Sequence, residues 1–277
     1  MKTVALPNGE RVPALGQGTW KMGDDRAARA GEIAALQAGI ERGLTLIDTA
    51  EMYGDGRAEA LVAEAIAGRR GQVFIVSKVL PNHAGTRATL AACDASLKRL
   101  QTDCIDLYLL HWRGSVPFAE TLEAFTALKR AGKIRHYGVS NLDLNDMREW
   151  WQCAGGDAMV TNQLLYNLSR RGIEWDLLPW LREQRVPLMA YSPFEQARLL
   201  QQKPLADFAR HHGLTVAQAA LAWLLANDDV IVIPKSGNRA RTEENAAALE
   251  ITLTAAQRAE LDGLFPPPAG PRALEML

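Results

Sequence analysis

The strongest constraint on the fold is a repeated alternation between short apolar runs and longer segments of helical periodicity. The apolar runs predict eight strands, at residues 14–18, 44–48, 73–78, 105–111, 137–140, 159–163, 187–191 and 230–233. The periodic segments predict helices at residues 26–42, 58–67, 86–100, 119–131, 144–152, 174–183, 215–226, 239–249 and 254–264. Strands that alternate with helices form parallel sheets, so eight such units in 277 residues predict a single (β/α)8 TIM barrel domain over residues 1–277.

Two local patterns refine this prediction. Residues 3–6 and 11–13 flank an Asn-Gly pair at positions 8 and 9, which predicts an N-terminal β-hairpin, and the surplus helical segments predict extra helices. The alternative architecture is a doubly wound sheet, which binds a dinucleotide at a glycine-rich first turn. The two G-x-G sequences, at residues 16–18 and 54–56, lack the third glycine because Lys21 and Glu59 occupy that position. Their absence disfavours the doubly wound alternative.

Charge and cysteine content exclude several classes of partner. The chain has 31 Lys and Arg against 32 Asp and Glu, with no run of five basic residues, so we expect neither nucleic-acid nor membrane-surface binding. The first 13 residues are too polar for a signal peptide, and no apolar stretch is long enough to span a bilayer. Three cysteines without C-x-x-C spacing favour a reducing compartment, so we expect a cytoplasmic protein with no metal site.

Ionisable side chains terminate three consecutive predicted strands. Asp48 ends the second strand, Lys78 the third and His111 the fourth, while Tyr53 follows Asp48 by five residues. In a barrel the carboxyl ends of the strands meet at one mouth, which is where catalytic groups gather. Each residue alone has an ordinary structural reading, but their joint placement predicts a catalytic group.

The chemistry of these four residues is complementary. A tyrosine hydroxyl titrates near pH 10, and we expect the Lys78 ammonium to lower that pKa while Asp48 holds the lysine charged. A neutral His111 can donate a hydrogen bond to a substrate oxygen. Tyr53 would then act as a general acid toward an oxygen that becomes negative, which suits the reduction of a carbonyl.

Four motifs extend this reading along the chain. They are Leu-Ile-Asp-Thr-Ala-Glu-Met-Tyr-Gly at 46–54, Tyr-Leu-Leu-His-Trp at 108–112, Gly-Val-Ser-Asn at 138–141 and Ile-Pro-Lys-Ser at 233–236. With these motifs in this order, the sequence resembles the aldo-keto reductase family over essentially its whole length. The resemblance places the family's catalytic tetrad on Asp48, Tyr53, Lys78 and His111, and it implies an NADPH cofactor bound without a Rossmann domain.

The resemblance also implies a set of cofactor-binding residues. Ser140, Asn141 and Gln163 would bind the carboxamide, Tyr191 would stack on the nicotinamide, and Lys235 with Arg241 would meet the 2′-phosphate beside the start of a helix. The complete set is Thr19, Trp20, Asp48, Ser140, Asn141, Gln163, Tyr191, Ser192, Pro193, Phe194, Pro234, Lys235, Ser236, Asn238, Arg241, Glu244 and Asn245.

For the substrate, the resemblance implies an aromatic mouth lined by Trp20, Tyr53, His111 and Trp112. The tail after Phe265 is short compared with the loop of steroid-reducing members, so we expect an open pocket. We therefore expect a monomer that reduces small aldehydes, ketones or 2-oxoaldehydes of the methylglyoxal type.

Two other functions stay open at this point. Lys78 could form a Schiff base in a barrel lyase, which borohydride trapping would reveal. Alternatively, the chain could be an NADPH-binding regulatory subunit with little turnover, which slow single-turnover kinetics would support.

Overall fold

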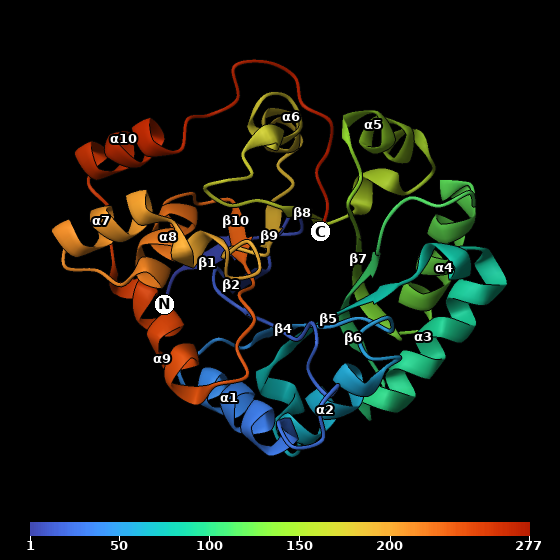
Figure 1. Cartoon of the computed structure of the whole chain (residues 1–277). Helices are drawn as coiled ribbons and strands as arrows, with labels where there is room; N and C mark the ends of the chain where they lie inside the picture. The colour runs from blue at the N-terminus through green and yellow to red at the C-terminus, as the bar shows by residue number, and fades with distance from the viewer.

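Eight parallel strands form a closed barrel in the computed structural model, which describes residues Met1–Leu277. The strands are β3 (Gln17–Gly18), β4 (Leu46–Asp48), β5 (Phe74–Val79), β6 (Ile105–Leu110), β7 (Ile134–Ser140), β8 (Asn162–Leu165), β9 (Leu188–Tyr191) and β10 (Val230–Val232). Each strand pairs with the next along the chain, and Figure 1 shows them at the centre of a ring of helices. The predicted TIM barrel is confirmed.

The seam between β3 and β10 closes the barrel through backbone hydrogen bonds. Gly16 N donates to Val232 O at 2.8 Å, and Val232 N donates to Ala14 O at 2.8 Å. Gly18 N donates to Pro234 O at 2.9 Å. Because β3 pairs regularly over only two residues, these bonds extend the contact beyond the strand itself.

The predicted hairpin is present and covers one end of the barrel. Strands β1 (Thr3–Ala5) and β2 (Arg11–Pro13) pair antiparallel around a turn in which Gly9 has φ +87°. Glu10, beside this turn, accepts hydrogen bonds from Arg135 and His136 at the start of β7, both at 2.7 Å. The hairpin therefore lies at the amino ends of the strands and leaves the carboxyl ends free for a site.

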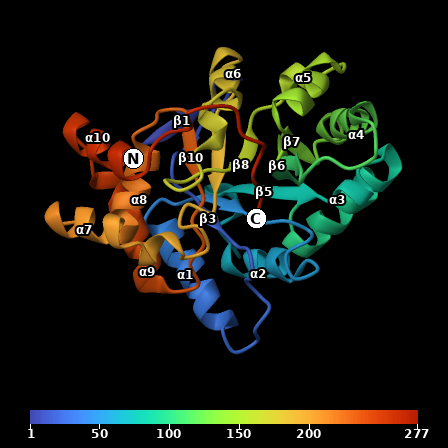
Figure 2. The same cartoon turned by 45° about the horizontal axis from the view of Figure 1, so that its top comes forward.

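Ten helices surround the barrel (Figures 1 and 2). They are α1 (Arg29–Glu41), α2 (Arg57–Ala65), α3 (Thr86–Leu100), α4 (Phe118–Arg130), α5 (Leu144–Gln152), α6 (Leu177–Glu183), α7 (Lys203–His211), α8 (Val216–Leu225), α9 (Arg239–Ala247) and α10 (Ala255–Leu264). Short 3-10 turns occur at Arg70–Gln72, Pro81–His83, Gly156–Ala158, Gly172–Glu174, Leu199–Gln201 and Ala248–Glu250. No helix combines the length and the apolar character needed to cross a membrane.

Local sequence explains where several of these helices begin. Thr215 caps α8 through a capping box with Gln218, and Thr254 caps α10 in the same way with Gln257. Asp143 caps α5 by accepting from two backbone N–H groups. Helix α7 was not predicted, and it buries only Leu205, Phe208 and Ala209.

The last segment, residues 266–277, leaves α10 and crosses the barrel instead of staying at its edge. Figures 1 and 2 show it passing α6 and ending over the centre of the barrel. Its final residues therefore belong to the description of the mouth.

Candidate active site

The centre of the site is a buried ion pair between neighbouring strands. Asp48 ends β4 and Lys78 lies near the end of β5, and the lysine side chain is completely buried. Lys78 Nζ donates to both carboxylate oxygens of Asp48, at 2.7 and 2.9 Å, and to Thr49 O at 2.9 Å. Burial lowers the pKa of Lys78, while the charge and hydrogen bond of Asp48 oppose that shift.

Tyr53 completes this chain of contacts. Its loop follows β4, and its hydroxyl lies 3.1 Å from Lys78 Nζ. Contrary to the prediction from the sequence, the pKa of Tyr53 is raised well above its ordinary 10.0, first because burial disfavours the phenolate and second because Asp48 is negative. Tyr53 therefore keeps its proton at neutral pH and can donate it.

His111 lies on the other side of the tyrosine, directly after β6. The two rings meet edge to face with centroids 5.9 Å apart. Burial and then the charge of Lys78 lower the pKa of His111 to about 2, so the imidazole is neutral at physiological pH. Its buried Nδ1 has no hydrogen-bond partner. A neutral imidazole has a single N–H to donate.

A polar network from the next three strands supports these residues. Asn141 Nδ2 donates to His111 O at 3.2 Å, and Tyr191 Oη donates to Asn141 Oδ1 at 3.0 Å. Gln163 Nε2 donates to Asp48 Oδ1 at 2.7 Å. The predicted carboxamide-binding residues thus also brace the tetrad.

A cavity of about 1050 Å³ extends from this group across the barrel mouth. This volume slightly exceeds the usual range of about 300–1,000 Å³ for small-molecule sites, so the cavity has room for a dinucleotide with a small substrate. Tyr53, Asp48 and His111 line it, together with the predicted residues Trp20, Trp112, Ser140, Asn141, Gln163, Tyr191, Ser192, Pro193, Phe194, Lys235, Ser236, Arg241, Glu244 and Asn245.

Four predicted residues do not line the cavity. Lys78 lies behind Tyr53, and the buried Thr19 donates its hydroxyl to Asp48 O at 2.9 Å. Asn238 caps helix α9 by accepting from Arg241 N at 3.1 Å. Pro234 takes part in the barrel seam through its carbonyl. These residues hold the frame of the site.

The far end of the cavity is basic and adjoins the start of α9. Lys235 and Arg241 line it, and neither forms an ion pair within the chain. Backbone N–H groups at a helix N-terminus add positive potential. Two unpaired cations at a helix start are the arrangement that favours a phosphate group.

Several lining residues were missed by the sequence analysis. Lys21 lines the cavity with φ +62°, and its ammonium lies 4.4 Å from the centre of the Trp20 ring. Gln196 and Ala197 come from the long loop after β9, and Met276 and Leu277 come from the final segment. The tail predicted to leave the pocket open therefore reaches the mouth. Only the adjacency of Lys21 to Trp20 offered a clue.

The fold and the site together define a class of protein, the barrel oxidoreductases that reduce carbonyl groups with a nicotinamide dinucleotide. The chain belongs to the aldo/keto reductase family, whose model matches residues 14–265. It is 51% identical to methylglyoxal reductase YeaE of Escherichia coli over 100% of this chain and 99% of that protein. It is 34% identical to the glyoxal reductase of Bacillus subtilis, over 95% of this chain and 92% of that protein.

Solved structures agree with this assignment. An aldo/keto reductase from Klebsiella pneumoniae, in complex with NADP and acetate, superimposes with a TM-score of 0.97 at 50% identity. A second structure from the same organism, in complex with NADPH, gives the same TM-score and identity. Both cover 100% of this chain and 99% of theirs.

Proposed function

We propose that this protein uses NADPH to reduce the carbonyl group of small aldehydes, ketones and 2-oxoaldehydes. The observation that carries the proposal is the Asp48–Lys78–Tyr53 chain at one end of a cavity whose other end holds unpaired cations. The names of the methylglyoxal and glyoxal reductases support 2-oxoaldehydes as the substrate class.

In this proposal Tyr53 is the general acid. The bound dinucleotide supplies the hydride. Tyr53 donates its proton to the substrate oxygen as negative charge develops there, and Lys78 stabilises the resulting phenolate at 3.1 Å. Asp48 opposes the lowering of the Lys78 pKa by burial, which favours the charged form, and it holds the lysine in place. Neutral His111 donates a hydrogen bond that orients the substrate oxygen.

Cofactor binding is assigned to the rest of the cavity. Ser140, Asn141 and Gln163 would bind the carboxamide, with Tyr191 stacked on the ring. Lys235 and Arg241 would bind the 2′-phosphate. Lys21 adds a further cation to the same cavity.

The mouth favours small and uncharged carbonyl compounds. Trp20 and Met52 line it and are 38% and 46% exposed, so apolar surface faces the entering substrate. Trp112 packs against His111 with ring centroids 4.7 Å apart, which narrows the space beside the reacting oxygen.

The geometry does not favour the Schiff-base alternative. A lysine that attacks a carbonyl must present a free amine to the substrate. Lys78 Nζ is fully buried, and its three donor positions face Asp48, Thr49 O and Tyr53. We further propose that the chain works in the cytoplasm as a single-domain monomer without nucleic-acid partners, and light scattering of the purified protein tests the monomer.

The variant Tyr53→Phe tests the mechanism. With NADPH and methylglyoxal, we expect kcat to fall at least about 100-fold, because general acid catalysis typically contributes that much or more. NADPH binding should persist, since only a hydroxyl is removed. Tyr108→Phe is the matched control, because Tyr108 is buried away from the cavity and its hydroxyl has no hydrogen-bond partner. A Tyr53→Phe enzyme that turns over normally would refute the mechanism.

A further inference from the structure

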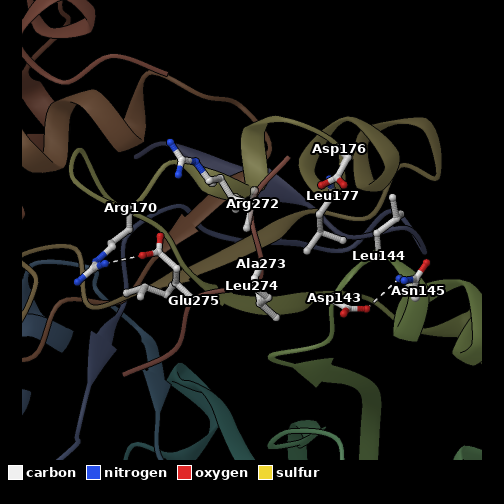
Figure 3. Close-up of a pocket in the computed structure, with 13 residues that line it drawn as sticks. Asp143, Leu144, Asn145, Arg170, Asp176, Leu177, Arg272, Ala273, Leu274 and Glu275 are labelled. Atoms are coloured by element: carbon white, nitrogen blue, oxygen red, sulfur yellow. Dashed lines mark hydrogen bonds and ion pairs between the residues drawn. The ribbon is translucent and has the colours of Figure 1, made fainter. Parts of the chain in front are cut away.

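One arginine joins two segments that are far apart in the sequence. Arg170 follows β8, and its guanidinium contacts Glu195 Oε1 through Nε at 2.9 Å and through NH2 at 2.8 Å. Through NH1 it contacts Glu275 Oε1 at 2.5 Å. Figure 3 shows Arg170 reaching the tail at Glu275. Glu195 belongs to the loop after β9, so the two carboxylates are 80 residues apart in the sequence but share one cation.

The loop that carries Glu195 has an unusual backbone. Glu195, Gln196 and Ala197 have φ values of +51°, +52° and +71°, and none of them is glycine. Such conformations cost about 1 kcal/mol or more each and persist only where neighbouring contacts enforce them. Gln196 and Ala197 line the proposed cofactor cavity. The loop therefore depends on an anchor next to the cavity.

Glu195 is that anchor. Its side chain is only 5% exposed and also accepts from Asn167 Nδ2 at 3.0 Å. Burial alone would raise its pKa, but hydrogen bonds from Arg170 and Asn167 hold the pKa below its ordinary value. Glu195 is thus ionised at neutral pH and bound to Arg170 as a charge-assisted pair.

Residues 266–277, at the other end of the Arg170 contacts, are held by fewer polar contacts than Glu195. Residues 272–275 lie over a small cavity of about 170 Å³ between the start of α5 and the loop that precedes α6 (Figure 3). Leu274 packs against the core, and Glu275 forms the only ion pair of residues 266–277. Beyond Glu275, Met276 and Leu277 line the large cavity, and Leu277 N lies 3.4 Å from Tyr191 Oη. Arg170 therefore supplies the one ion pair among the contacts that hold the tail over the mouth.

We propose that Arg170 is a positioning residue that links residues 192–198 to residues 272–277, so that ordering of the loop by NADPH also fixes the tail over the substrate. The proposal rests on the proposed function, because it takes residues 192–197 as part of the cofactor site. Linkage of this kind is reciprocal, so the tail also supports the loop. The charges balance, since Arg198 lies 3.2 Å from Glu195 and supplies the second cation for the two carboxylates.

Hydrogen exchange measured by mass spectrometry, with and without NADPH, tests the link. In the wild-type protein we expect NADPH to slow exchange in both residues 192–198 and residues 272–277, the latter about fivefold or more. In Arg170→Met and in Glu275→Gln, protection of the tail should disappear. By reciprocity, NADPH affinity in these variants should fall by no more than the same factor.

Arg198→Met is the matched control. Arg198 contacts the same Glu195 oxygen as Arg170 but does not contact the tail. Protection of residues 272–277 by NADPH should therefore remain in this variant. Glu275→Gln leaves the Glu195 contacts intact, which keeps the test valid if Arg170→Met folds poorly.

The outcomes separate the two proposals. If NADPH fails to bind or to protect residues 192–198 in the wild-type protein, the cofactor assignment is wrong. If the loop is protected but the tail is not, or if tail protection survives in both Arg170→Met and Glu275→Gln, the role of Arg170 is refuted while the proposed function stands.

Discussion

If Arg241 binds the 2′-phosphate as we propose, its replacement by methionine should separate recognition of that phosphate from binding of the rest of the dinucleotide. Arg241 lines the basic end of the cavity, is exposed, and forms no ion pair within the chain. Its removal should therefore change the stability of the free protein little and should mainly weaken ligand binding. NADH lacks the phosphate that this side chain would meet, so its binding is the internal reference.

The size of the effect follows from the exposure of the site. A hydrogen bond to a charged group contributes about 1.5–3 kcal/mol, and solvent screening at an exposed side chain favours the lower end. Since about 1.4 kcal/mol corresponds to a tenfold change in affinity, we expect the Kd for NADPH to rise about tenfold. The Kd for NADH should change by less than about twofold, because no charge-assisted contact is lost.

Fluorescence titration with NADPH and NADH at fixed ionic strength measures both constants. Arg239→Met is the control, because Arg239 starts the same helix but pairs with Glu243 at 3.2 Å and does not line the cavity. That variant should bind both dinucleotides like the wild-type protein. The reasoning fails if Arg241→Met weakens NADH and NADPH equally, or if it leaves both unchanged.

Two further predictions concern pH and packing. The kcat for carbonyl reduction should be constant from about pH 6 to about pH 9. Tyr53 loses its proton only above its raised pKa, and His111 gains one only below a pH of about 2. A pH–rate profile with a step near pH 6.5 would contradict this. Gly39→Ala should lower the free energy of unfolding by about 1–3 kcal/mol, because the added Cβ would lie 2.1 Å from Gln17 Oε1, whose amide donates to Leu36 O and Leu44 O. Urea titration measures the free energy of unfolding of both variants. The control is Gly263→Ala in α10, where no atom lies within 4 Å of the new Cβ, so this change should leave the stability unchanged or raise it. If both variants have the same stability, Gln17 moves aside and the packing argument is wrong.

Periodicity and strand ends made most of the fold predictable. The predicted limits of α3 and α5 match the structure, because strong apolar stripes and a capping aspartate mark them. The strand predicted at 159–163 is displaced to Asn162–Leu165, since residues 159–161 approach β7 with irregular backbone bonds. Helix α7 escaped prediction because it begins at Lys203-Pro204 and buries few apolar residues.

Energetic features of the site were less accessible. The sequence placed Lys78 and Tyr53 together correctly, but the sign of the tyrosine shift depends on burial, which a linear pattern does not report. The Arg170 contacts span 25 and 105 residues of sequence, and no local motif accompanies them. Ion pairs between distant loops depend on the finished arrangement of the barrel.

The seam of the barrel has a consequence for how the chain is made. Strand β3 cannot form its second set of backbone hydrogen bonds until Val232 and Pro234 have been synthesised, more than 210 residues after Gly18. Until then the growing sheet has two unpaired edges, which are sites of mispairing between nascent chains. Trp20 and Lys235 lie on either side of this seam, so a dinucleotide bound in the cavity would contact both strands that close the barrel last. Its binding would stabilise the folded protein in proportion to the logarithm of the dinucleotide concentration.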